Sequence, residues 1–309
     1  MLRMSLICVA TCLLPIGGCA SSGGGEGEGS QVVATTTHVA DIAQNVAGDR
    51  VDVHSMLAAN ADPHDFEPRP SDVTAMAEAD LVITSGGEVD EWVDELIESS
   101  GTDADVVSLL DSAPVTRTSE GETDPHWWQD PRNAVAATET IRDELADADP
   151  EGESEYAENE SAYSREIEQA DRAVAECMSS LPDGVRKLVT SHDALGYLAD
   201  RYDIEVVGAA IPALSTQAQP SVGETAELID LIEEEGVRAV FPETGLSGEL
   251  EEAIAHEADV AVGEPLYADA LGEARTPGDT YLGTIAWNAS ALIEGFSGGA
   301  SGCEVPEAS

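Results

Sequence analysis

The feature that most constrains this fold is one long helical segment in the middle of the chain. Residues 153–180 contain neither glycine nor proline, Pro150 precedes them and Pro182 follows them. A helix of about 27 residues is roughly 40 Å long, which is enough to run between two lobes. Its apolar and small residues recur at steps of seven, four and three, the spacing of one helical face. They are Tyr156, Tyr163, Ile167, Ala170, Val174, Cys177 and Leu181. The pattern predicts a rigid linker helix over residues 150–182.

Two halves of similar pattern flank this linker. Short runs rich in β-branched residues alternate with helical stretches, which is typical of βαβ units and parallel sheets. The paired runs are 31–35 with 187–190, 51–53 with 205–207, 81–84 with 238–241, and 105–107 with 259–262. We therefore expect two Rossmann-like α/β lobes, residues 31–149 and 183–309, each with a sheet of about four strands. Ligands of such lobes bind beyond the C-terminal strand ends, here in the cleft between the lobes.

The N-terminus has the pattern of an export signal, which we assign to residues 1–18. Arg3 precedes an apolar stretch over residues 5–16 that is too short to span a bilayer comfortably. The small residues before Cys19 resemble a lipobox, and this resemblance implies that Cys19 becomes a lipidated N-terminus. An ordinary signal peptide with an incidental cysteine is the alternative. Gly, Ser and Glu dominate the residues that follow, so residues 19–30 are expected to form a flexible tether.

The charge balance excludes one class of partner. The chain has 62 acidic and 13 basic residues, and its net charge of −49 repels the phosphates of nucleic acid. Hydrophobic residues make up 42% of the chain, so the acid belongs to a folded protein and not to a disordered one. Such a surface suits a halophilic protein, because concentrated salt screens self-repulsion within roughly 3 Å at 1 M. We expect a monomer.

Apart from the cysteines of the export signal and the predicted lipidation site Cys19, the chain has two cysteines, Cys177 and Cys303. An exported compartment permits a disulfide between them, which would fasten the C-terminal tail to the second half. Two free buried thiols are the alternative. The pair has no CxxC spacing, so a thiolate metal site is not indicated.

Histidines follow the predicted strands. His64 and His126 both stand in the tripeptide Asp-Pro-His, whose proline stiffens the loop, and His192 directly follows the first strand of the second half. Asp279 lies just before the last helical stretch. Three neutral imidazoles and one carboxylate from both lobes would form a four-coordinate site for a divalent metal.

Four motifs in order carry a family resemblance. They are 58–68 (AANADPHDFEP), 124–128 (DPHWW), 190–197 (TSHDALGY) and 278–281 (GDTY). With them the chain, from Val32 to Phe296, resembles the solute-binding lipoproteins of zinc and manganese ABC importers, the ZnuA/TroA type of cluster A-I. The resemblance implies a bilobed fold with His64, His126, His192 and Asp279 as metal ligands. It also implies a protein without catalytic activity, lipid-anchored on the outer face of the cell membrane, that delivers its ion to a permease driven by a cytoplasmic ATPase.

The third histidine bears on the metal. Members that resemble manganese binders carry a carboxylate where His192 stands, so a third imidazole favours Zn²⁺ over Mn²⁺. A member that binds Mn²⁺ or Fe²⁺ is the alternative. Many zinc-type members also carry a His-rich acidic loop before the second Asp-Pro-His, whereas residues 118–124 contain no histidine.

Further candidates surround this set. Glu243 ends a strand of the second lobe and is expected to accept a hydrogen bond from a ligand histidine or to serve as a substitute carboxylate; an exposed loop acid is the alternative. His38 occupies the position equivalent to His192 and is expected to line the cleft beside the ligands, or to be a strand-end histidine bonded to backbone. Trp127 and Trp128 are expected to wall the site. A zinc hydrolase with Glu243 as its base is a hypothesis of another class, opposed by the absence of a His-Glu-x-x-His motif. An adhesin of the same fold also stays open.

Overall fold

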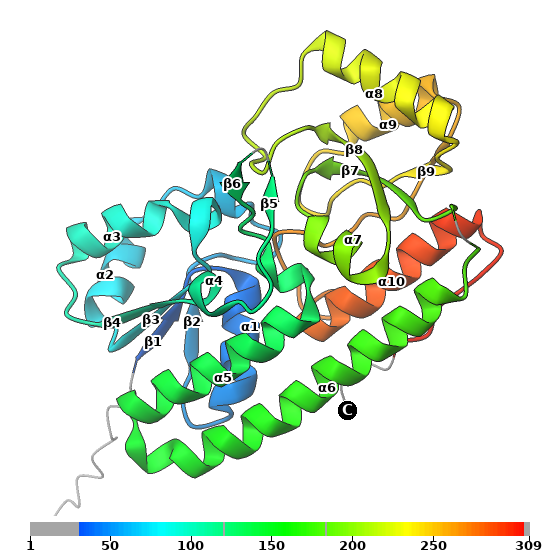
Figure 1. The fold of residues 1–309 in the computed structure, drawn as a ribbon. Helices are drawn as coiled ribbons and strands as arrows, with labels where there is room; N and C mark the ends of the chain where they lie inside the picture. Colours follow the sequence, from blue (N-terminus) through cyan, green and yellow to red (C-terminus); the bar gives the residue numbers. More distant parts are fainter. Residues whose placement is uncertain (1–30, 120, 183, 306–309) are drawn as a thin grey trace, which may run out of the picture.

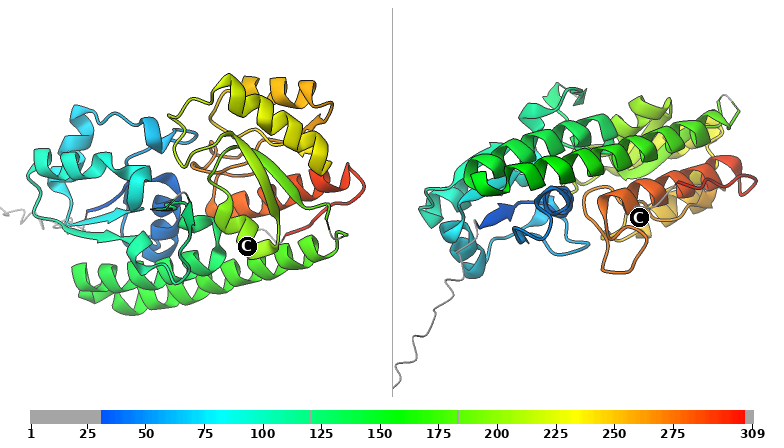
Figure 2. Two further views of the ribbon diagram at one scale, coloured as in Figure 1. Left: turned by 45° about the horizontal axis from the view of Figure 1, so that its top comes forward. Right: turned by 90° about the horizontal axis from the view of Figure 1, so that it is seen from below.

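The computed structural model describes residues 31–119, 121–182 and 184–305. Two α/β lobes lie side by side above a layer of long helices (Figure 1 and Figure 2). The predicted export signal, tether and lipidated Cys19 lie outside the described residues. Within them, no helix is both long and apolar enough to cross a membrane. The predicted two-lobed α/β class with parallel sheets and a long helix is confirmed.

The first lobe is built on one parallel sheet of four strands in the order β2-β1-β3-β4. Its strands are β1 (Val32–Ala34), β2 (Val53–Ser55), β3 (Leu81–Thr84) and β4 (Asp105–Ser108). Val32 of the central strand lies opposite Val53 on one side and Leu81 on the other. One face packs on α1 (Thr37–Ala47) and α5 (Pro131–Ala148), and the other on α2 (Pro70–Glu78) and α3 (Trp92–Ser100). Burial on both faces explains why β1 and β3 are continuous apolar runs without alternation.

The second lobe repeats this strand order with two longer strands, β7 and β8, and two shorter ones, β9 and β10. Its strands are β7 (Lys187–His192), β8 (Glu205–Ile211), β9 (Ala239–Val240) and β10 (Ala261–Val262). They form two parallel pairs, β7-β8 and β9-β10. The backbone N–H of Phe241, just after β9, donates to the carbonyl of Val189 in β7 at 2.9 Å. This bond places the strands in the order β8-β7-β9-β10. The expected single sheet of four strands is therefore two pairs joined by one bond beyond the end of β9.

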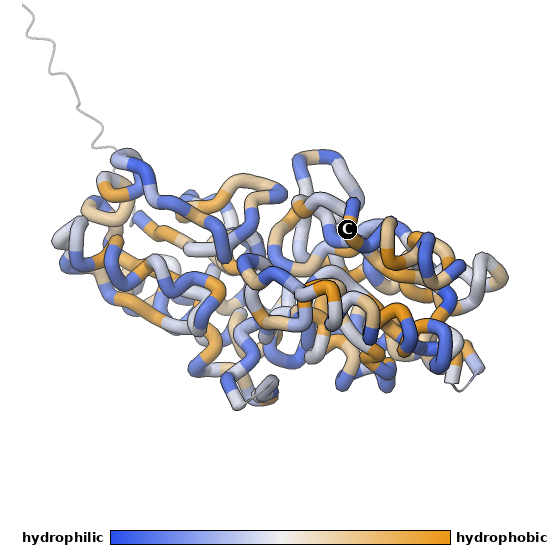
Figure 3. The backbone as a smooth tube through the Cα atoms, turned by 90° about the horizontal axis from the view of Figure 1, so that it is seen from above, coloured by the Kyte–Doolittle hydropathy of each residue, from blue (hydrophilic) through white to orange (hydrophobic). Residues whose placement is uncertain are grey.

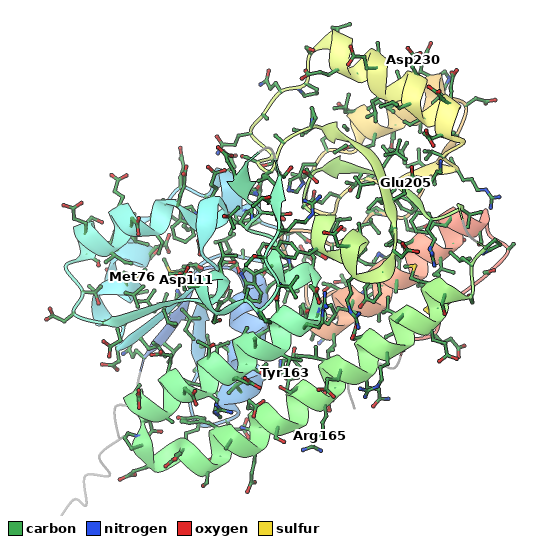
Figure 4. All side chains as sticks on the ribbon, in the orientation of Figure 1. Met76, Asp111, Tyr163, Arg165, Glu205 and Asp230 are labelled. Carbon is green, nitrogen blue, oxygen red and sulfur yellow. A yellow bond between two sulfur atoms is a disulfide. The ribbon has the colours of Figure 1, made fainter. Side chains whose placement is uncertain are left out.

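Helices cover both faces of the second lobe as well. α8 (Val222–Glu235) and α9 (Glu249–Glu257) bury Leu228 and Ile254 against one face. α7 (Gly196–Tyr202) packs on the other face together with the long helices. Acidic side chains lie on the solvent side of these helices, as Figure 4 shows for Asp230, and hydrophilic segments recur along both lobes in Figure 3.

The linker helix α6 (Glu153–Ser179) shares its buried face between the two cores. Tyr163 and Ile167 belong to the core of the first lobe, whereas Val174 and Met178 belong to that of the second. In Figure 4, Tyr163 points inward from the helix and Arg165 points to solvent. Because the one helix is built into both cores, bending it would disrupt apolar packing on either side.

A second helix also joins the lobes. α10 (Tyr281–Ser297) contributes Tyr281 and Leu282 to the first core, and Leu292 and Phe296 to the second. The sequence pattern predicted a single connecting helix, so the structure adds one. It packs against α6 (Figure 2), so two helices, α6 and α10, are shared between the two cores.

A disulfide joins Cys177, in the last turn of α6, to Cys303, beyond the end of α10. It fastens the C-terminal segment to α6 and links residues 126 positions apart in the sequence. Of the two alternatives left open by the sequence, the structure has the bonded pair.

Candidate metal centre

Three histidines and one aspartate meet between the lobes. They are His64, His126, His192 and Asp269, and one ligand atom of each lies within 4.8 Å of all the others. The Nε2 atoms of the three histidines lie 3.3, 3.3 and 3.1 Å from the nearest carboxylate oxygen of Asp269, in the order given. The three imidazole centroids form a triangle with sides of 5.8, 5.8 and 5.4 Å.

Each residue of this cluster comes from the end of a strand or from a loop that follows one. His192 is the last residue of β7, and His64 lies in the short turn after β2. His126 directly precedes the turn of Trp127–Gln129, and Asp269 follows the bridge between Leu266 and Glu243. The first lobe supplies two histidines and the second lobe supplies His192 and the aspartate, so the site exists only when the lobes are together.

The cluster is buried and unsatisfied. The side chains of its three histidines and its aspartate are at most 4% exposed. Within the described residues, the three Nε2 atoms and both oxygens of Asp269 have no hydrogen-bond partner. Buried polar atoms normally have a partner, because leaving one unpaired costs on the order of 1–3 kcal/mol. Five such atoms that face one another match the donor set that a buried cation needs.

Two of the imidazoles are held by a carboxylate on their far side. Nδ1 of His126 lies 2.8 Å from an oxygen of Asp124, and Nδ1 of His192 lies 2.7 Å from an oxygen of Glu243. An acceptor at Nδ1 fixes the proton there and leaves the lone pair of Nε2 directed into the cluster, which is the arrangement of metal-bound histidines. The prediction that Glu243 accepts from a histidine of the cluster agrees with this geometry.

Electrostatics in the cluster favour a positive charge. Burial lowers the pKa of His192, but the carboxylates of Glu243 and Asp269 outweigh burial and raise it well above 6.5. Burial raises the pKa of Asp269, but the imidazoles of His192 and His126 outweigh it and hold that pKa well below 3.8. The carboxylates that favour a protonated His192 also favour a metal cation in the cluster.

The two Asp-Pro-His tripeptides have the same local hydrogen bond, but the second oxygen of each aspartate has a different partner. In each, the aspartate accepts from the backbone N–H of its histidine, at 2.9 Å for Asp62 and 3.0 Å for Asp124. The second oxygen of Asp62 accepts from the hydroxyl of Thr216 in the second lobe at 2.6 Å. The side chain of Gln217 also donates to the carbonyl of His64. The loop of His64 is therefore held closed by the opposite lobe.

Trp128 walls the site, as predicted from the sequence, and Trp127 packs edge-on behind it, with ring centroids 5.9 Å apart. Both are at most 1% exposed, and the ring of Trp128 meets that of His126 edge-on, with centroids 5.4 Å apart. The indole N–H of Trp128 and the amide of Gln129 both donate to the carbonyl of Ala268, at 2.9 and 2.8 Å. The segment that carries His126 thus also positions the residue before Asp269.

The structure does not bring Asp279, the predicted fourth ligand, into this cluster. Its carboxylate accepts from the backbone N–H of Arg275 at 2.6 Å, and its own N–H donates to the carbonyl of Thr276, so it closes a loop on itself. Thr280 then caps α10 through its hydroxyl. The motif marks the start of a helix, whereas the carboxylate that joins the three histidines is that of Asp269, ten residues earlier.

His38 is a neighbour of the cluster and not a member of it. Its ring stacks on Trp128 with centroids 5.2 Å apart and lies edge-on to Tyr281. Burial lowers its pKa to about 4, against the opposing effect of the Asp269 carboxylate, so the ring is neutral. His38 therefore packs beneath the site as an uncharged aromatic group.

Sequence reasoning missed Asp269 and the role of Asp124. Asp269 stands alone in the otherwise uncharged segment 265–272, and such an acid in a buried run is a signal that needs a partner. Asp124 was visible only as part of a tripeptide. Its burial raises its pKa, but hydrogen bonds from His126 and Arg117 outweigh that effect and lower it, which keeps the carboxylate ionised.

Comparison with known proteins gives concordant results. The family model described as "ZnuA: Zinc-uptake complex component A periplasmic" matches residues 32–295. The chain is 32% identical over 272 residues to the iron-binding protein YfeA of Yersinia pestis, covering 86% of each chain. It is 29% identical over 275 residues to the manganese-binding lipoprotein MntA of Halalkalibacterium halodurans, covering 88% of this chain and 90% of that one. The structure of the periplasmic zinc-binding protein TroA of Treponema pallidum superposes with a TM-score of 0.81 at 27% identity, covering 86% of this chain and 99% of that one.

Proposed function

This chain belongs to the ZnuA family, and from that premise we propose that it captures a divalent transition-metal ion and delivers it to the permease of an ABC importer. The observation that carries the proposal is the buried cluster of His64, His126, His192 and Asp269, whose five unpaired donor atoms face one another. Sites of this kind bind a dication because the ion satisfies every donor at once.

Zinc is the ion that the donor set suits best. Three imidazole nitrogens and one carboxylate match the four-coordinate nitrogen and oxygen sites of Zn²⁺, whereas Mn²⁺ favours sites richer in oxygen. The relatives carry names for iron, manganese and zinc binding, so the donor set of this chain, and not kinship, supports the choice. Fe²⁺ and Mn²⁺ are the competitors that an experiment must include.

Delivery is supported by the names of two further relatives, SloC of Streptococcus mutans and SsaB of Streptococcus sanguinis, each called a metal ABC transporter substrate-binding lipoprotein. In this proposal Cys19 carries the lipid, residues 19–30 are the tether, and a monomer sits on the outer face of the membrane beside the permease and its cytoplasmic ATPase. The surface acid keeps the protein soluble in concentrated salt.

The arrangement does not favour catalysis. The base proposed for a hydrolase, Glu243, is committed to Nδ1 of His192 at 2.7 Å and is 3% exposed. A catalytic zinc keeps an open position for water, whereas four buried protein ligands from two lobes close this site.

The proposal is tested by titrating the purified full-length chain with Zn²⁺, Mn²⁺ and Fe²⁺ against a chromophoric chelator. We expect one site per chain, tightest for Zn²⁺, and a loss of affinity of more than about 100-fold in His126→Ala and His192→Ala. The exposed His256 on α9 gives the matched control, His256→Ala, which should bind as the wild type does. Wild-type affinity in the two cluster variants would show that the ion binds elsewhere.

A further inference from the structure

One arginine connects the lobes directly behind the metal cluster. Arg117 leads into the hairpin of β5 (Thr118–Ser119) and β6 (Glu122–Thr123) in the first lobe, and its guanidinium is within 3.0 Å of Asp124. It also lies 3.3 Å from Asp200 and 4.0 Å from Asp193, both in the second lobe. Its side chain is 23% exposed and borders a cavity of about 510 Å³ between the lobes.

The contact with Asp124 leads straight to a proposed ligand. One oxygen of Asp124 accepts from Arg117, while the other accepts from Nδ1 and from the backbone N–H of His126. Both oxygens of this fully buried carboxylate are therefore used. Outer partners of a metal-bound histidine set its ring orientation and tautomer, so the position of Arg117 bears on the lone pair of His126.

The second lobe holds the arginine where it is needed. The hydroxyl of Tyr197 accepts from the backbone N–H of Arg117 and donates to the carbonyl of Asp124, each at 3.0 Å. Gly196 leaves space for the guanidinium, because a Cβ at that position would lie 2.1 Å from the central carbon of Arg117. The arrangement of Arg117 and Asp124 is therefore complete only when the lobes are closed.

Arg117 also contributes to the charge balance of the buried site. Three carboxylates surround the histidines, those of Asp124, Glu243 and Asp269, and none is more than 4% exposed. Among the described residues, Arg117 is the only arginine or lysine that forms a salt bridge with any of them. Together with a bound dication, Arg117 offsets the negative charge of these three buried carboxylates.

We propose that Arg117 is a positioning residue for metal capture, which orients His126 through Asp124 only when the second lobe is in contact. Through Arg117, the orientation of His126, and with it the affinity of the site for the metal, depends on closure of the lobes. This inference rests on the proposed function, because it concerns the affinity of the same site.

The test measures Zn²⁺ affinity of the full-length chain by chelator competition and the visible spectrum of the Co²⁺ form. Arg117→Met should weaken Zn²⁺ binding by about 10–100-fold and shift the Co²⁺ bands, because His126 loses its fixed orientation. Arg117→Lys should recover part of the affinity, since it keeps the charge without the planar fork. Arg132→Met is the matched control, because Arg132 pairs with Asp130 and with no carboxylate of the cluster.

Two further variants separate positioning from a general loss of structure. Gly196→Ala displaces the guanidinium without removing its charge, and it should weaken binding in the same direction as Arg117→Met. In an Asp124→Asn background, Arg117→Met should cost less than about threefold, because the route through Asp124 is already broken. Full additivity of the two substitutions, or wild-type Zn²⁺ affinity and Co²⁺ spectrum in Arg117→Met, would overturn the inference. If the wild-type chain itself bound no Zn²⁺, the proposed function would fail instead.

Discussion

Asp41 is a largely buried carboxylate where α1 meets α6 and α10, the two helices shared by the lobes. Its negative charge lowers the stability of the folded protein there. It projects from α1 and accepts from the backbone N–H of Tyr281 at the start of α10 and from the hydroxyl of Tyr163 on α6, at 3.0 and 3.2 Å. Burial raises its pKa from 3.8 to about 6, helped by the nearby Asp279 and opposed by the two hydrogen bonds. The folded protein therefore binds a proton at Asp41 more tightly than the unfolded chain does.

The sign of the effect follows from this difference. The stabilisation by the protonated group is fully present below pH 3.8 and is lost as the pH rises through about 6. A shift of about two pKa units changes the free energy of unfolding by at most about 3 kcal/mol. Because Asp41 keeps some solvent contact, we expect a change of about 1–3 kcal/mol. Asp41→Asn, which keeps an acceptor oxygen and has no charge, should not show this loss.

The assay is urea unfolding of wild type and Asp41→Asn between pH 4 and pH 7.5, in 2 M salt so that the many surface acids repel one another less. The free energy of unfolding of the variant should rise relative to wild type by about 1–3 kcal/mol from the lowest to the highest pH. Asp52→Asn, at an exposed position, is the control for loss of one negative charge. A constant difference between Asp41→Asn and wild type over this range would refute the reasoning.

Two further predictions concern closure and the tail. Thr216→Val removes the hydroxyl that binds Asp62 across the cleft. Release of Zn²⁺ to excess chelator, followed by stopped flow, should therefore become about 3–10-fold faster. Thr225→Val on α8 is the control, and equal release rates in both variants would contradict the role of this bond. Replacing Cys177 and Cys303 by serine should lower the free energy of unfolding by about 2–5 kcal/mol, measured in urea, and an unchanged midpoint would show that the bridge does not stabilise the fold.

Periodicity was enough to predict the architecture. The long apolar face of α6 and the paired strand patterns are local properties of the sequence, and they predicted two lobes and their linker correctly. The role of α10 was not predicted, because its apolar residues look the same whether they pack on one core or on two. The shortness of β9 and β10 also depends on packing between segments, which the pattern does not contain.

The site was predictable where the loop itself constrains the side chain. The structure brings together His64, His126 and His192, two of which stand in stiff Asp-Pro-His loops whose aspartate binds the local backbone. The carboxylate was assigned to Asp279, which lies in a motif but is turned away by its own loop. Asp269 reaches the histidines only because the chain after β10 returns to the cleft, where Trp128 of the first lobe binds the carbonyl of Ala268.

The same limit applies to the outer partners. Glu243 was a candidate because it ends a strand, and the structure places it on His192. The link from Arg117 to Asp124 joins residues seven positions apart across a hairpin, and its contacts in the second lobe arise only from closure. A pattern of residue types carries no information about such a contact between lobes.

The central claim is that His64, His126, His192 and Asp269 together hold the transported ion. It is tested most directly by the Zn²⁺ affinities of Asp269→Asn and Asp279→Asn, measured side by side by chelator competition. The Zn²⁺ affinity of Asp269→Asn should fall by more than the 10–100-fold, roughly, that is usual when a residue touching only a ligand is replaced. The affinity of Asp279→Asn should stay within about twofold of wild type. Unchanged affinity in Asp269→Asn, or the larger loss in Asp279→Asn, would contradict the account.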